Sequence, residues 1–243
     1  MSSCRSNEAG GVCRGMNTEE TVCALIPAYN EAESVSSVIE GTRRHVGTLF
    51  LIDDGSRDGT AEIAEAAGAI CLRRPRNGGK GTALCDGIAH IAGGNYSYVL
   101  FMDGDGQHRP EDIPSLLRVA RETSADLVIG ARSFDRMRIP RERYFSNSTG
   151  SRIATWLIGR SVRDSQSGFR LVRFDKLKGL RLRARKYEIE MEILIKMSRS
   201  GSTIAHVPIS MVYPEGRARS KMKPIRDTAH ICLWSLLFRF LKL

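Results

Sequence analysis

The sharpest chemical signal in this chain is a pair of aspartates separated by a single glycine, Asp103-Gly104-Asp105. The pair directly follows the apolar run SYVLFM, and Gln107 comes two positions after it. Two carboxylates at this spacing can face one cation, and the amide of Gln107 adds a neutral oxygen. Hard oxygen ligands are typical of Mg²⁺ and Mn²⁺ sites that also take substrate phosphates. The pattern therefore predicts a divalent metal, Mg²⁺ or Mn²⁺, held by Asp103, Asp105 and Gln107. The alternative is a polar turn whose aspartates cap a helix.

Three further polar or glycine-rich segments follow apolar runs in the same way. They are PAYNE at 27–31, DDGS at 53–56 and RNGGKG at 76–81. Ligands of open parallel sheets bind beyond the carboxyl ends of the strands, so four such segments predict a single ligand-binding rim. A carboxylate at this rim is well placed to accept hydrogen bonds from a base or from ribose hydroxyls.

Apolar runs alternate with helical patterns along the chain, and these elements must position the rim. The predicted strands are Thr21–Pro27, Thr48–Asp53, Ala69–Leu72, Ser97–Asp103, Asp126–Gly130, Phe169–Phe174 and Ile204–Tyr213. The predicted helices are 31–45, 58–67, 80–92, 110–123, 144–159, 188–200 and 224–243. Pro208 makes the last strand an edge strand or a bulge. The alternation predicts an α/β fold with a doubly wound, mostly parallel sheet and helices on both faces.

The composition fits one ordinary domain. The chain has 243 residues, 42% of them hydrophobic, and no apolar run of about 18 residues that would cross a membrane. We expect a disordered leader over 1–20, one domain over 21–223 and a C-terminal amphipathic helix over 224–243. The six cysteines include no C-x-x-C pair, which disfavours a zinc site and favours reduced thiols in a cytoplasmic protein.

Two nucleotide-binding signatures are missing from the sequence. The loop at 77–81 is not G-x-x-x-x-G-K-[ST], and no G-x-G-x-x-G follows the first strand. The sequence therefore disfavours a P-loop nucleoside triphosphatase and a dinucleotide-dependent dehydrogenase.

Charge is divided unevenly along the chain. Residues 1–131 contain 12 Lys and Arg against 18 Asp and Glu, whereas residues 132–243 contain 25 against 9. A basic half indicates an anionic partner, which is nucleic acid, anionic lipid or a phosphorylated substrate. The alternative is a solvated basic surface.

The motifs together resemble a known family. They are PAYNE (27–31), IDDGSRDGT (52–60), NGGKG (77–81), DGDGQHRPED (103–112), GAR (130–132), DSQSGFR (164–170), YEIEMEIL (187–194) and VPISMVYPEGRARSKM (207–222). In this order, over about residues 22–223, they are similar to family 2 glycosyltransferases of the GT-A fold. The branch that they resemble most is dolichol-phosphate mannose synthase-like and glycosylates polyprenyl phosphates. That branch usually reads DADLQH where this chain has DGDGQH, a departure that removes no metal ligand.

The resemblance implies a role for each matching residue. Pro27, Tyr29 and Glu31 form the floor of a nucleotide pocket, Asp54 contacts the base, and Lys80 lies near the nucleotide. Asp103, Asp105 and Gln107 hold the metal that bridges the donor diphosphate, with Gly104 between them. Arg132, Arg217 and Lys221 are phosphate-binding cations.

The implied reaction moves a hexose from a nucleoside-diphosphate sugar, of the GDP-mannose or UDP-glucose type, to an acceptor with inversion. A phosphomonoester has its second pKa near ~6 and attacks without a base, whereas a sugar hydroxyl needs a carboxylate base. The candidate bases are Asp164, Glu188, Glu190 and Glu192. Glu188 and Glu192 share one helix face and Glu190 points away from it. The expected role of Glu190 is to act as a base, to bind a donor hydroxyl or to orient an arginine. The alternative for each glutamate is a place on a solvated acidic helix face.

Two basic segments lie near the C-terminus. Arg217, Arg219, Lys221 and Lys223 alternate with uncharged residues, which in an extended chain gathers them on one face of a lid over the donor. The helix over 224–243 combines aromatic and basic residues, which suits a membrane interface on the cytoplasmic side. Its alternative is packing on the sheet or on a homodimer partner.

Four other interpretations are weighed against this one. A glycosyltransferase of this fold could act on a soluble sugar or another hydroxyl acceptor. A sugar nucleotidyltransferase needs a basic glycine-rich loop after the first strand, where this chain has PAYNE. A nucleic-acid-binding module needs exposed aromatics among its basic residues, and aromatics make up only 7% of this chain. An inactive relative that serves as a scaffold is disfavoured by the intact acidic pair.

Overall fold

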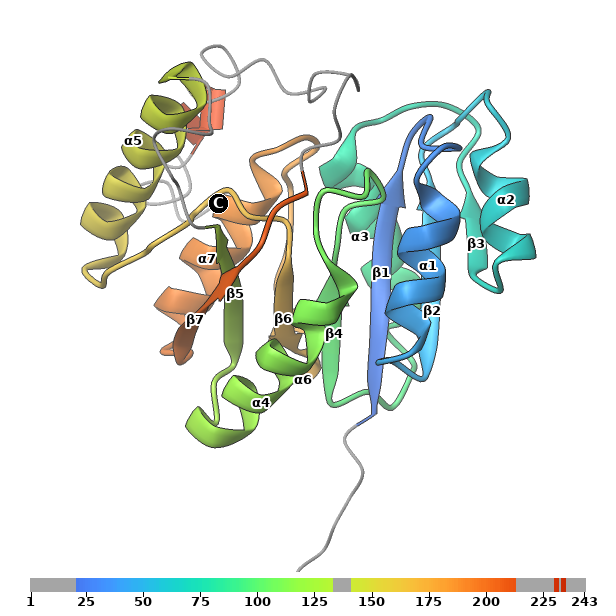
Figure 1. Cartoon of the computed structure of the whole chain (residues 1–243). Coiled ribbons are helices and arrows are strands. Elements are labelled where there is room, and N and C mark those ends of the chain that lie inside the picture. The colour runs from blue at the N-terminus through green and yellow to red at the C-terminus, as the bar shows by residue number, and fades with distance from the viewer. Residues whose placement is uncertain (1–20, 133–140, 213–229, 232, 235–243) are drawn as a thin grey trace, which may run out of the picture.

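A seven-stranded sheet with helices on both faces forms the framework (Figure 1). The computed structural model describes residues 21–132, 141–212, 230, 231, 233 and 234. The strands lie in the order β3-β2-β1-β4-β6-β5-β7. Their bounds are β1 (Val22–Ala28), β2 (Thr48–Asp53), β3 (Ile70–Arg73), β4 (Tyr98–Phe101), β5 (Leu127–Arg132), β6 (Arg170–Arg173) and β7 (Ile204–Ile209). Among these strands only β6 runs antiparallel to its neighbours β4 and β5. The predicted mostly parallel, doubly wound sheet is confirmed.

The helices divide between the two faces of the sheet. Their bounds are α1 (Val35–Arg43), α2 (Thr60–Ala66), α3 (Lys80–His90), α4 (Ile113–Thr123), α5 (Arg141–Ile158), α6 (Phe174–Lys178) and α7 (Ile189–Arg199), with a 3₁₀ turn η1 (Pro110–Asp112) before α4. Helices α1, α2 and α4 cover one face, whereas α3, α6 and α7 cover the other and α5 packs on α7. In Figure 1 the α1 and α4 helices stand in front of the sheet and α3 and α7 behind it.

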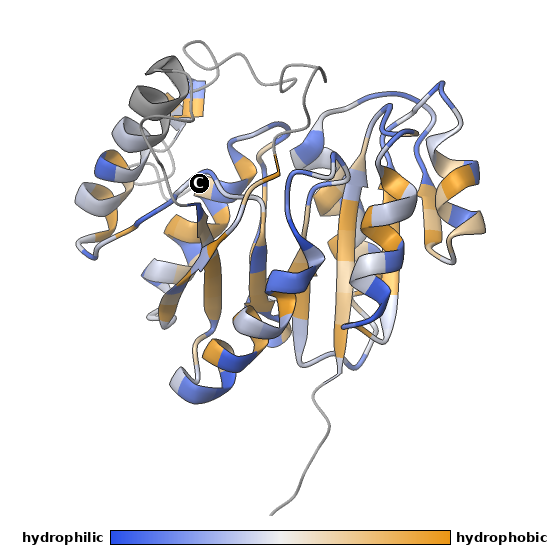
Figure 2. Ribbon diagram, in the orientation of Figure 1, coloured by the Kyte–Doolittle hydropathy of each residue, from blue (hydrophilic) through white to orange (hydrophobic). Residues whose placement is uncertain are grey.

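Strand alternation builds a separate apolar core on each face. In β1, Cys23 and Leu25 belong to the core beneath α3 and α7, and Ala24 and Ile26 belong to the core beneath α1 and α4. Successive side chains of a strand point to opposite faces, so a central strand covered on both sides must be apolar throughout. Figure 2 shows this as largely hydrophobic strands beneath more hydrophilic loops. The continuous apolar runs in the sequence thus encode the two-layered burial.

Some predicted bounds differ from the observed ones. β4 ends at Phe101, before the acidic pair, and β7 ends at Ile209 rather than at 213. β7 is an edge strand, as Pro208 predicted. Helix α6 was not predicted, because five residues are too few to show a helical period. The leader expected over 1–20 and most of the helix expected over 224–243 lie outside the described residues. Within the described part of the chain, no helix has both the length and the apolarity to cross a membrane.

A basic segment fits closely against the start of α3 and is hydrogen-bonded to α7. This segment, residues 181–186 (RLRARK), is called the basic strap below. The amide of Thr82 donates a hydrogen bond of 3.1 Å to the carbonyl of Arg185. A Cβ on Gly81 would lie 2.5 Å from the carbonyl oxygen of Ala184, closer than side-chain carbons approach backbone. Glycine at position 81 therefore permits the contact between α3 and the strap.

We expect Gly81→Ala to lower the free energy of unfolding by about 1–3 kcal/mol, because the backbone on which the new methyl group lies must move. This loss would occur although alanine is favoured over glycine in a helix by about 1 kcal/mol. Gly93→Ala is the matched control, because a Cβ there meets no atom within 4 Å. Urea unfolding of both variants measures the difference. Equal stability of Gly81→Ala and wild type would contradict the close fit.

Candidate active site

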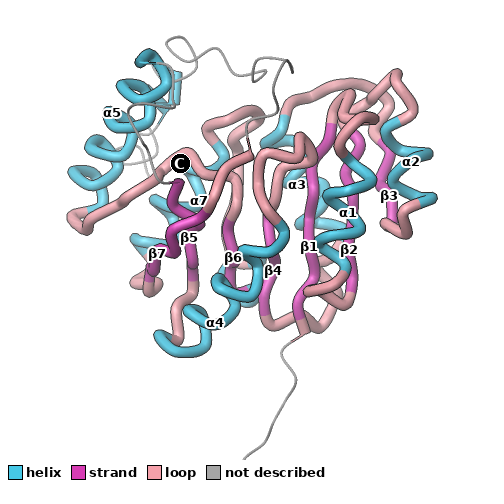
Figure 3. The backbone as a smooth tube through the Cα atoms, in the orientation of Figure 1, coloured by secondary structure: helices cyan, strands magenta, loops and turns pink. Residues whose placement is uncertain are grey.

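The loops after β1 and β2 are joined to each other at the predicted rim (Figure 3). The amides of Asn30, Glu31 and Ala32 donate to the side chains of Ser56, Thr60 and Asp58, at 2.9, 2.9 and 3.1 Å. These hydrogen bonds fix the loop that carries Tyr29 and Glu31, both half-buried. Pro27, Tyr29 and Glu31 therefore lie at one rim, as expected; the nucleotide contact predicted for them stays a prediction.

Asp54 holds the glycine-rich loop that leads into α3. Its two carboxylate oxygens accept hydrogen bonds from the amides of Gly78 and Gly79 at 2.9 and 2.8 Å, and it forms an ion pair with Arg74. The side chain is only 4% exposed. The structure thus gives Asp54 a role in shaping the loop before Lys80, and its expected contact with a base stays a prediction.

A lysine bridges two carboxylates at the centre of the rim. Nζ of Lys80 lies 2.5 Å from Oδ1 of Asp103 and 2.6 Å from Oε1 of Glu190. Burial alone raises the pKa of Asp103, but the neighbouring positive groups, above all the ammonium group of Lys80, together outweigh burial and hold this pKa below its usual value. Burial alone lowers the pKa of Lys80, and the two carboxylates raise it above its usual value. Lys80 and Asp103 are therefore both charged at neutral pH.

Gly168 makes room for this ion pair. A Cβ at this position would lie 2.6 Å from Nζ of Lys80 and 2.7 Å from Oδ2 of Asp103. The glycine of the motif DSQSGFR thus lets the backbone approach the charged pair directly. This is a role that the sequence analysis did not give to Gly168.

Asp105 completes the acidic pair. Its Oδ1 accepts a hydrogen bond of 3.0 Å from the amide of Gln107. Burial, with a further contribution from the carboxylate of Asp103, raises the pKa of Asp105 to about 6. A carboxylate that is costly to ionise beside another carboxylate is a site where added positive charge is favourable. The oxygen set of Asp103, Asp105 and Gln107 therefore fits a divalent cation, although no three described His, Cys, Asp or Glu side chains form a metal-binding group by themselves.

Gly104 fits tightly between the acidic pair and β1. A Cβ there would lie 3.2 Å from that of Ala28, and the Gly104 carbonyl accepts a hydrogen bond of 2.8 Å from Ser34 Oγ. The loop is thus fixed to α1 as well as to the sheet.

His108 is a buried polar residue that the sequence analysis missed. Its ring stacks on Phe169 with centroids 5.3 Å apart, and Nδ1 has no hydrogen-bond partner within the structure. Burial lowers the pKa of His108 to about 4, so the ring is neutral at pH 7. Its position directly after Gln107 was the available signal. A neutral imidazole nitrogen beside the acidic loop is an additional donor atom for a bound cation or ligand.

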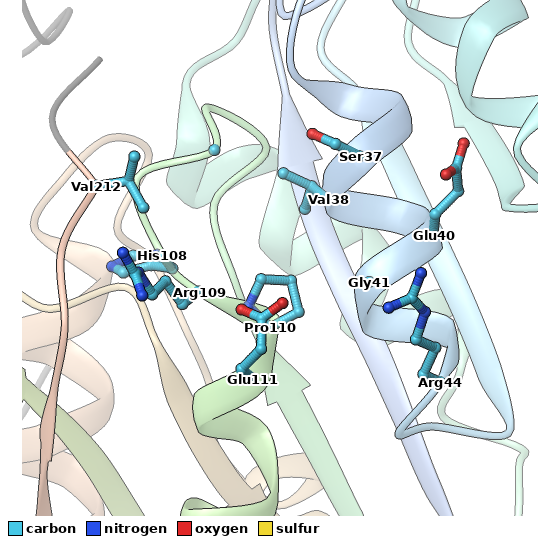
Figure 4. A pocket seen from close by; sticks show the side chains of 11 residues that line it. Ser37, Val38, Glu40, Gly41, Arg44, His108, Arg109, Pro110, Glu111 and Val212 are labelled. Carbon is cyan, nitrogen blue, oxygen red and sulfur yellow. The ribbon is translucent and has the colours of Figure 1, made fainter. Parts of the chain in front are cut away.

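A cavity of about 440 Å³ opens beside the acidic loop, between α1 and η1 (Figure 4). His108 and Arg109 lie on one side of it, and Ser37, Glu40 and Arg44 come from α1 on the other. Asp103, Asp105 and Lys80 do not line this cavity. It therefore borders the acidic site and is not its centre.

Arg132 is paired with one of the candidate bases. Its guanidinium donates to both oxygens of Asp164, at 2.6 and 2.9 Å. Burial alone raises the pKa of Asp164, but Arg132 outweighs it and lowers that pKa. Asp164 has no exposed side-chain surface, and both of its oxygens are engaged. These contacts disfavour Asp164 as a base and assign it to orienting Arg132, whose predicted phosphate contact stays a prediction.

The three glutamates of the YEIEMEIL segment are buried, so the alternative of a solvated acidic face is wrong. Glu188 and Glu192 share one face, as predicted, and accept hydrogen bonds from amides of the basic strap. Glu190 points the other way, towards Lys80. Of the three, Glu190 alone reaches the acidic site.

Arg170 is a fully buried arginine that sequence reasoning did not single out. Its guanidinium donates to the backbone carbonyls of Ser165, Ser167 and Glu190 at 2.7, 2.7 and 2.6 Å. Burial lowers its pKa to about 10, which still leaves the group charged at neutral pH. Arg170 therefore ties the segment that carries Gly168 to the start of α7.

The basic motif around Arg217 and Lys221, with Arg219 and Lys223, lies outside the described residues.

A family model and several curated relatives match this chain over most of its length. The family model described as glycosyl transferase family 2 matches residues 23–181. Glycosyltransferase AglJ of Haloferax volcanii is 34% identical over 224 residues, covering 90% of this chain and 72% of that protein. The undecaprenyl-phosphate mannosyltransferase of Micrococcus luteus is 31% identical over 212 residues, covering 80% of this chain and 84% of the relative.

The fold matches solved structures as well. Glucosyl-3-phosphoglycerate synthase from Mycobacterium tuberculosis, crystallised with phosphoglyceric acid, superposes with a TM-score of 0.72 at 23% identity, covering 91% of this chain and 80% of that one. This likeness shows the fold and confirms the predicted GT-A architecture. By the extent of the family match and the identity to its relatives, the chain belongs to glycosyl transferase family 2 and is a glycosyltransferase.

Proposed function

We propose that this glycosyltransferase moves a hexose, with inversion, from a nucleoside-diphosphate sugar to a polyprenyl phosphate. The donor is of the GDP-mannose or UDP-glucose type, and the reaction uses Mg²⁺ or Mn²⁺. The observation that carries the proposal is the acidic loop at the end of β4, with Asp103 paired to Lys80 and Asp105 beside it. Relatives named for transfer to undecaprenyl phosphate and dolichyl phosphate support the acceptor class.

The residues of the rim divide the work on the donor. Asp103, Asp105 and Gln107 would hold the divalent cation, which supplies positive charge to the departing diphosphate. Lys80 keeps Asp103 ionised and fixed in place, so the site needs little rearrangement when the donor binds. A structure of glucosyl-3-phosphoglycerate synthase with Mn²⁺ and UDP supports this use of the fold. Arg132, Arg217 and Lys221 are the proposed phosphate-binding cations.

The acceptor determines whether a base is required. A phosphomonoester oxygen is already anionic at neutral pH and attacks the sugar carbon as the bond to the diphosphate breaks. No proton needs to be removed, so Glu190 is free to position Lys80. A hydroxyl acceptor would require a base within hydrogen-bond reach. Because Glu190 is occupied by Lys80 at 2.6 Å, we favour the phosphate acceptor and a site at a membrane surface.

A donor panel tests the proposal. The full chain is incubated with GDP-mannose, UDP-glucose and UDP-N-acetylglucosamine, with Mn²⁺ or Mg²⁺, and with a polyprenyl phosphate in detergent. Phosphoglyceric acid serves as the soluble alternative acceptor. A glycolipid product supports the proposal, whereas transfer to phosphoglyceric acid alone would overturn the acceptor class.

We expect Asp103→Ala and Asp105→Ala each to lower kcat/KM at least about 100-fold, because each removes charge that anchors the cation beside the leaving group. Both variants should also lose the rise in Tm that Mn²⁺ gives to the wild type. Glu111→Gln is the control, since Glu111 is an exposed acid eight positions along from Asp103. Transfer at the wild-type rate by either alanine variant would refute the site.

Asp105 should also limit stability in the absence of metal. Its pKa is about 6 in the folded protein and near 3.8 in the unfolded chain, so the folded state binds its proton more tightly. Stability is therefore lost as pH rises from about 4 to 6, and the loss is complete above that window. With EDTA present, we expect Asp105→Asn to be more stable than wild type at pH 7.5 by about 1–2 kcal/mol.

This gain should disappear below pH 4, which urea unfolding across pH can measure. Asp126→Asn is the control of opposite sign. Burial alone raises the pKa of Asp126, but hydrogen bonds from Thr203 and Arg173 outweigh burial, so the pKa lies below its usual value. That variant should lose stability at pH 7.5. If the effect of Asp105→Asn on stability did not change with pH, the pKa of Asp105 would not be raised in the folded protein.

The bridge that Lys80 forms can be tested by substitution. Lys80→Met leaves two buried carboxylates without their counter-ion, so we expect a loss of about 3–5 kcal/mol in stability at pH 7. The double variant Lys80→Met/Glu190→Gln should recover part of this stability, because only one uncompensated carboxylate remains, yet should stay inactive. Urea unfolding and sugar transfer are measured on both. Full activity in the double variant would contradict a role of the bridge in catalysis.

A further inference from the structure

We propose that the basic strap, residues 181–186, is the surface by which the protein docks on an anionic lipid bilayer. The inference deepens the proposed function and rests on it, because a polyprenyl phosphate acceptor is held in a membrane. The strap belongs to the basic second half of the chain. It contributes no side chain to the acidic site or to the cavity beside that site.

The strap is built so that its arginines face outwards. Arg181, Arg183 and Arg185 are exposed, whereas Leu182 packs against the apolar core and Ala184 is 3% exposed. This alternation is that of an extended chain with one face on the protein. Three guanidinium groups therefore lie in a row on the solvent side.

Buried carboxylates of α7 hold the strap in this position. Glu192 accepts hydrogen bonds from the amides of Arg183 and Ala184, at 2.9 and 2.7 Å. Glu188 accepts from the amides of Arg185 and Lys186, at 3.1 and 3.2 Å. These bonds are made by the backbone and leave the arginine side chains exposed. The row of charges is thus fixed by the fold and is not a feature of a loose loop.

Further cations extend the charged surface. Lys186 and Arg199 are exposed, as are Lys176 and Lys178 of α6, and Asp175 is the single exposed acid among residues 173–187, all of which the structure describes. A shallow cavity of about 390 Å³ lies between the strap and the end of α7. It is lined by Arg181, Arg183, Lys196, Arg199, Leu180, Gly179 and Ser200. A cavity rimmed by guanidinium groups can take a phosphate headgroup, since Arg donates to phosphate oxygens in a fork.

The character of the surface favours a bilayer over a nucleic acid. Single-stranded nucleic acids are bound by basic grooves that contain aromatic platforms for the bases, and residues 175–186 include no aromatic residue. An anionic membrane presents many phosphates in a plane and requires no matched shape. A row of exposed arginines and lysines is sufficient for that interaction.

The strap is also connected to the site that would use the lipid. The carbonyl of Arg185 accepts hydrogen bonds from the amide and hydroxyl of Thr82, at 3.1 and 3.4 Å. Thr82 is two residues from Lys80, which is bonded to Asp103. A bilayer bound along the strap would therefore lie next to the rim at which a lipid-borne phosphate must arrive.

Vesicle flotation of the full chain tests the proposal. The test variant is Arg181→Gln/Arg183→Gln/Arg185→Gln, which keeps polar side chains and removes three charges. The matched control is Arg44→Gln/Arg118→Gln/Arg121→Gln, which removes three charges from exposed residues of α4 and the end of α1 on the opposite face. Vesicles consist of phosphatidylcholine alone or with 30% phosphatidylglycerol.

We expect the strap variant to bind phosphatidylglycerol vesicles about 100-fold more weakly than wild type, because each basic residue near an anionic surface contributes about fivefold. The control variant should bind within a few fold of wild type, and 0.5 M NaCl should weaken wild-type binding. Equal vesicle binding by the strap variant and the control would overturn the proposal. So would a strap variant that loses binding to duplex DNA while its vesicle binding is unchanged.

Sugar transfer to a polyprenyl phosphate in neutral detergent separates this proposal from the proposed function. The strap variant should keep wild-type transfer in detergent and lose it with phosphatidylglycerol vesicles that contain the acceptor. If the wild type binds these vesicles through the strap but transfers no sugar to the lipid, the proposed acceptor fails and the docking surface stands. Transfer that is lost equally in detergent would show that the strap acts on the catalytic site, which contradicts the docking role.

Discussion

The bridge that Lys80 forms between Asp103 and Glu190 is the interaction on which the site depends. It joins three elements that are far apart in the sequence, because Lys80 begins α3, Asp103 follows β4 and Glu190 lies in the first turn of α7. Burial disfavours the charged forms of Lys80 and Asp103, and each of the two stabilises the charge of the other. The fold of both halves therefore has to be correct before the acidic loop carries its charge.

Most of the supporting contacts around this bridge are made by backbone groups. Asp54 binds the amides before Lys80, and Arg170 binds carbonyls of the segment that approaches the ion pair and of the start of α7. Gly168 then presents bare backbone where any Cβ would displace Lys80 or Asp103. Charge-assisted hydrogen bonds to the main chain are shorter and stronger than those between neutral groups. These bonds fix the backbone around the site without using the side chains that would contact the substrate.

The sheet, its parallel strands and the acidic loop could be predicted because their signals are local. Apolar runs such as that of β1 fix the strands, and Asp103-Gly104-Asp105 is visible without any knowledge of its neighbours. The roles of Asp164 and Glu192 could not be predicted in this way. A glutamate in a helix looks the same in sequence whether it faces water or accepts two amides of a distant strap, and only the tertiary fold decides which. His108 and Arg170 escaped notice for the same reason.

The basic half of the chain illustrates why charge must be read by position. Arg170 is fully buried and serves the main chain, Arg132 is held by Asp164, and Lys196 is bonded to Glu192. Cations of this kind are already compensated and contribute little to the field outside the protein. The arginines of the strap differ, because the acids of α7 bind the backbone of the strap and leave its side chains exposed. Glu188 and Glu192 bind the backbone of the strap and not its guanidinium groups, and they thereby fix the three arginines in a row. The electrostatic field outside the protein therefore depends on the packing of α7 as well as on composition.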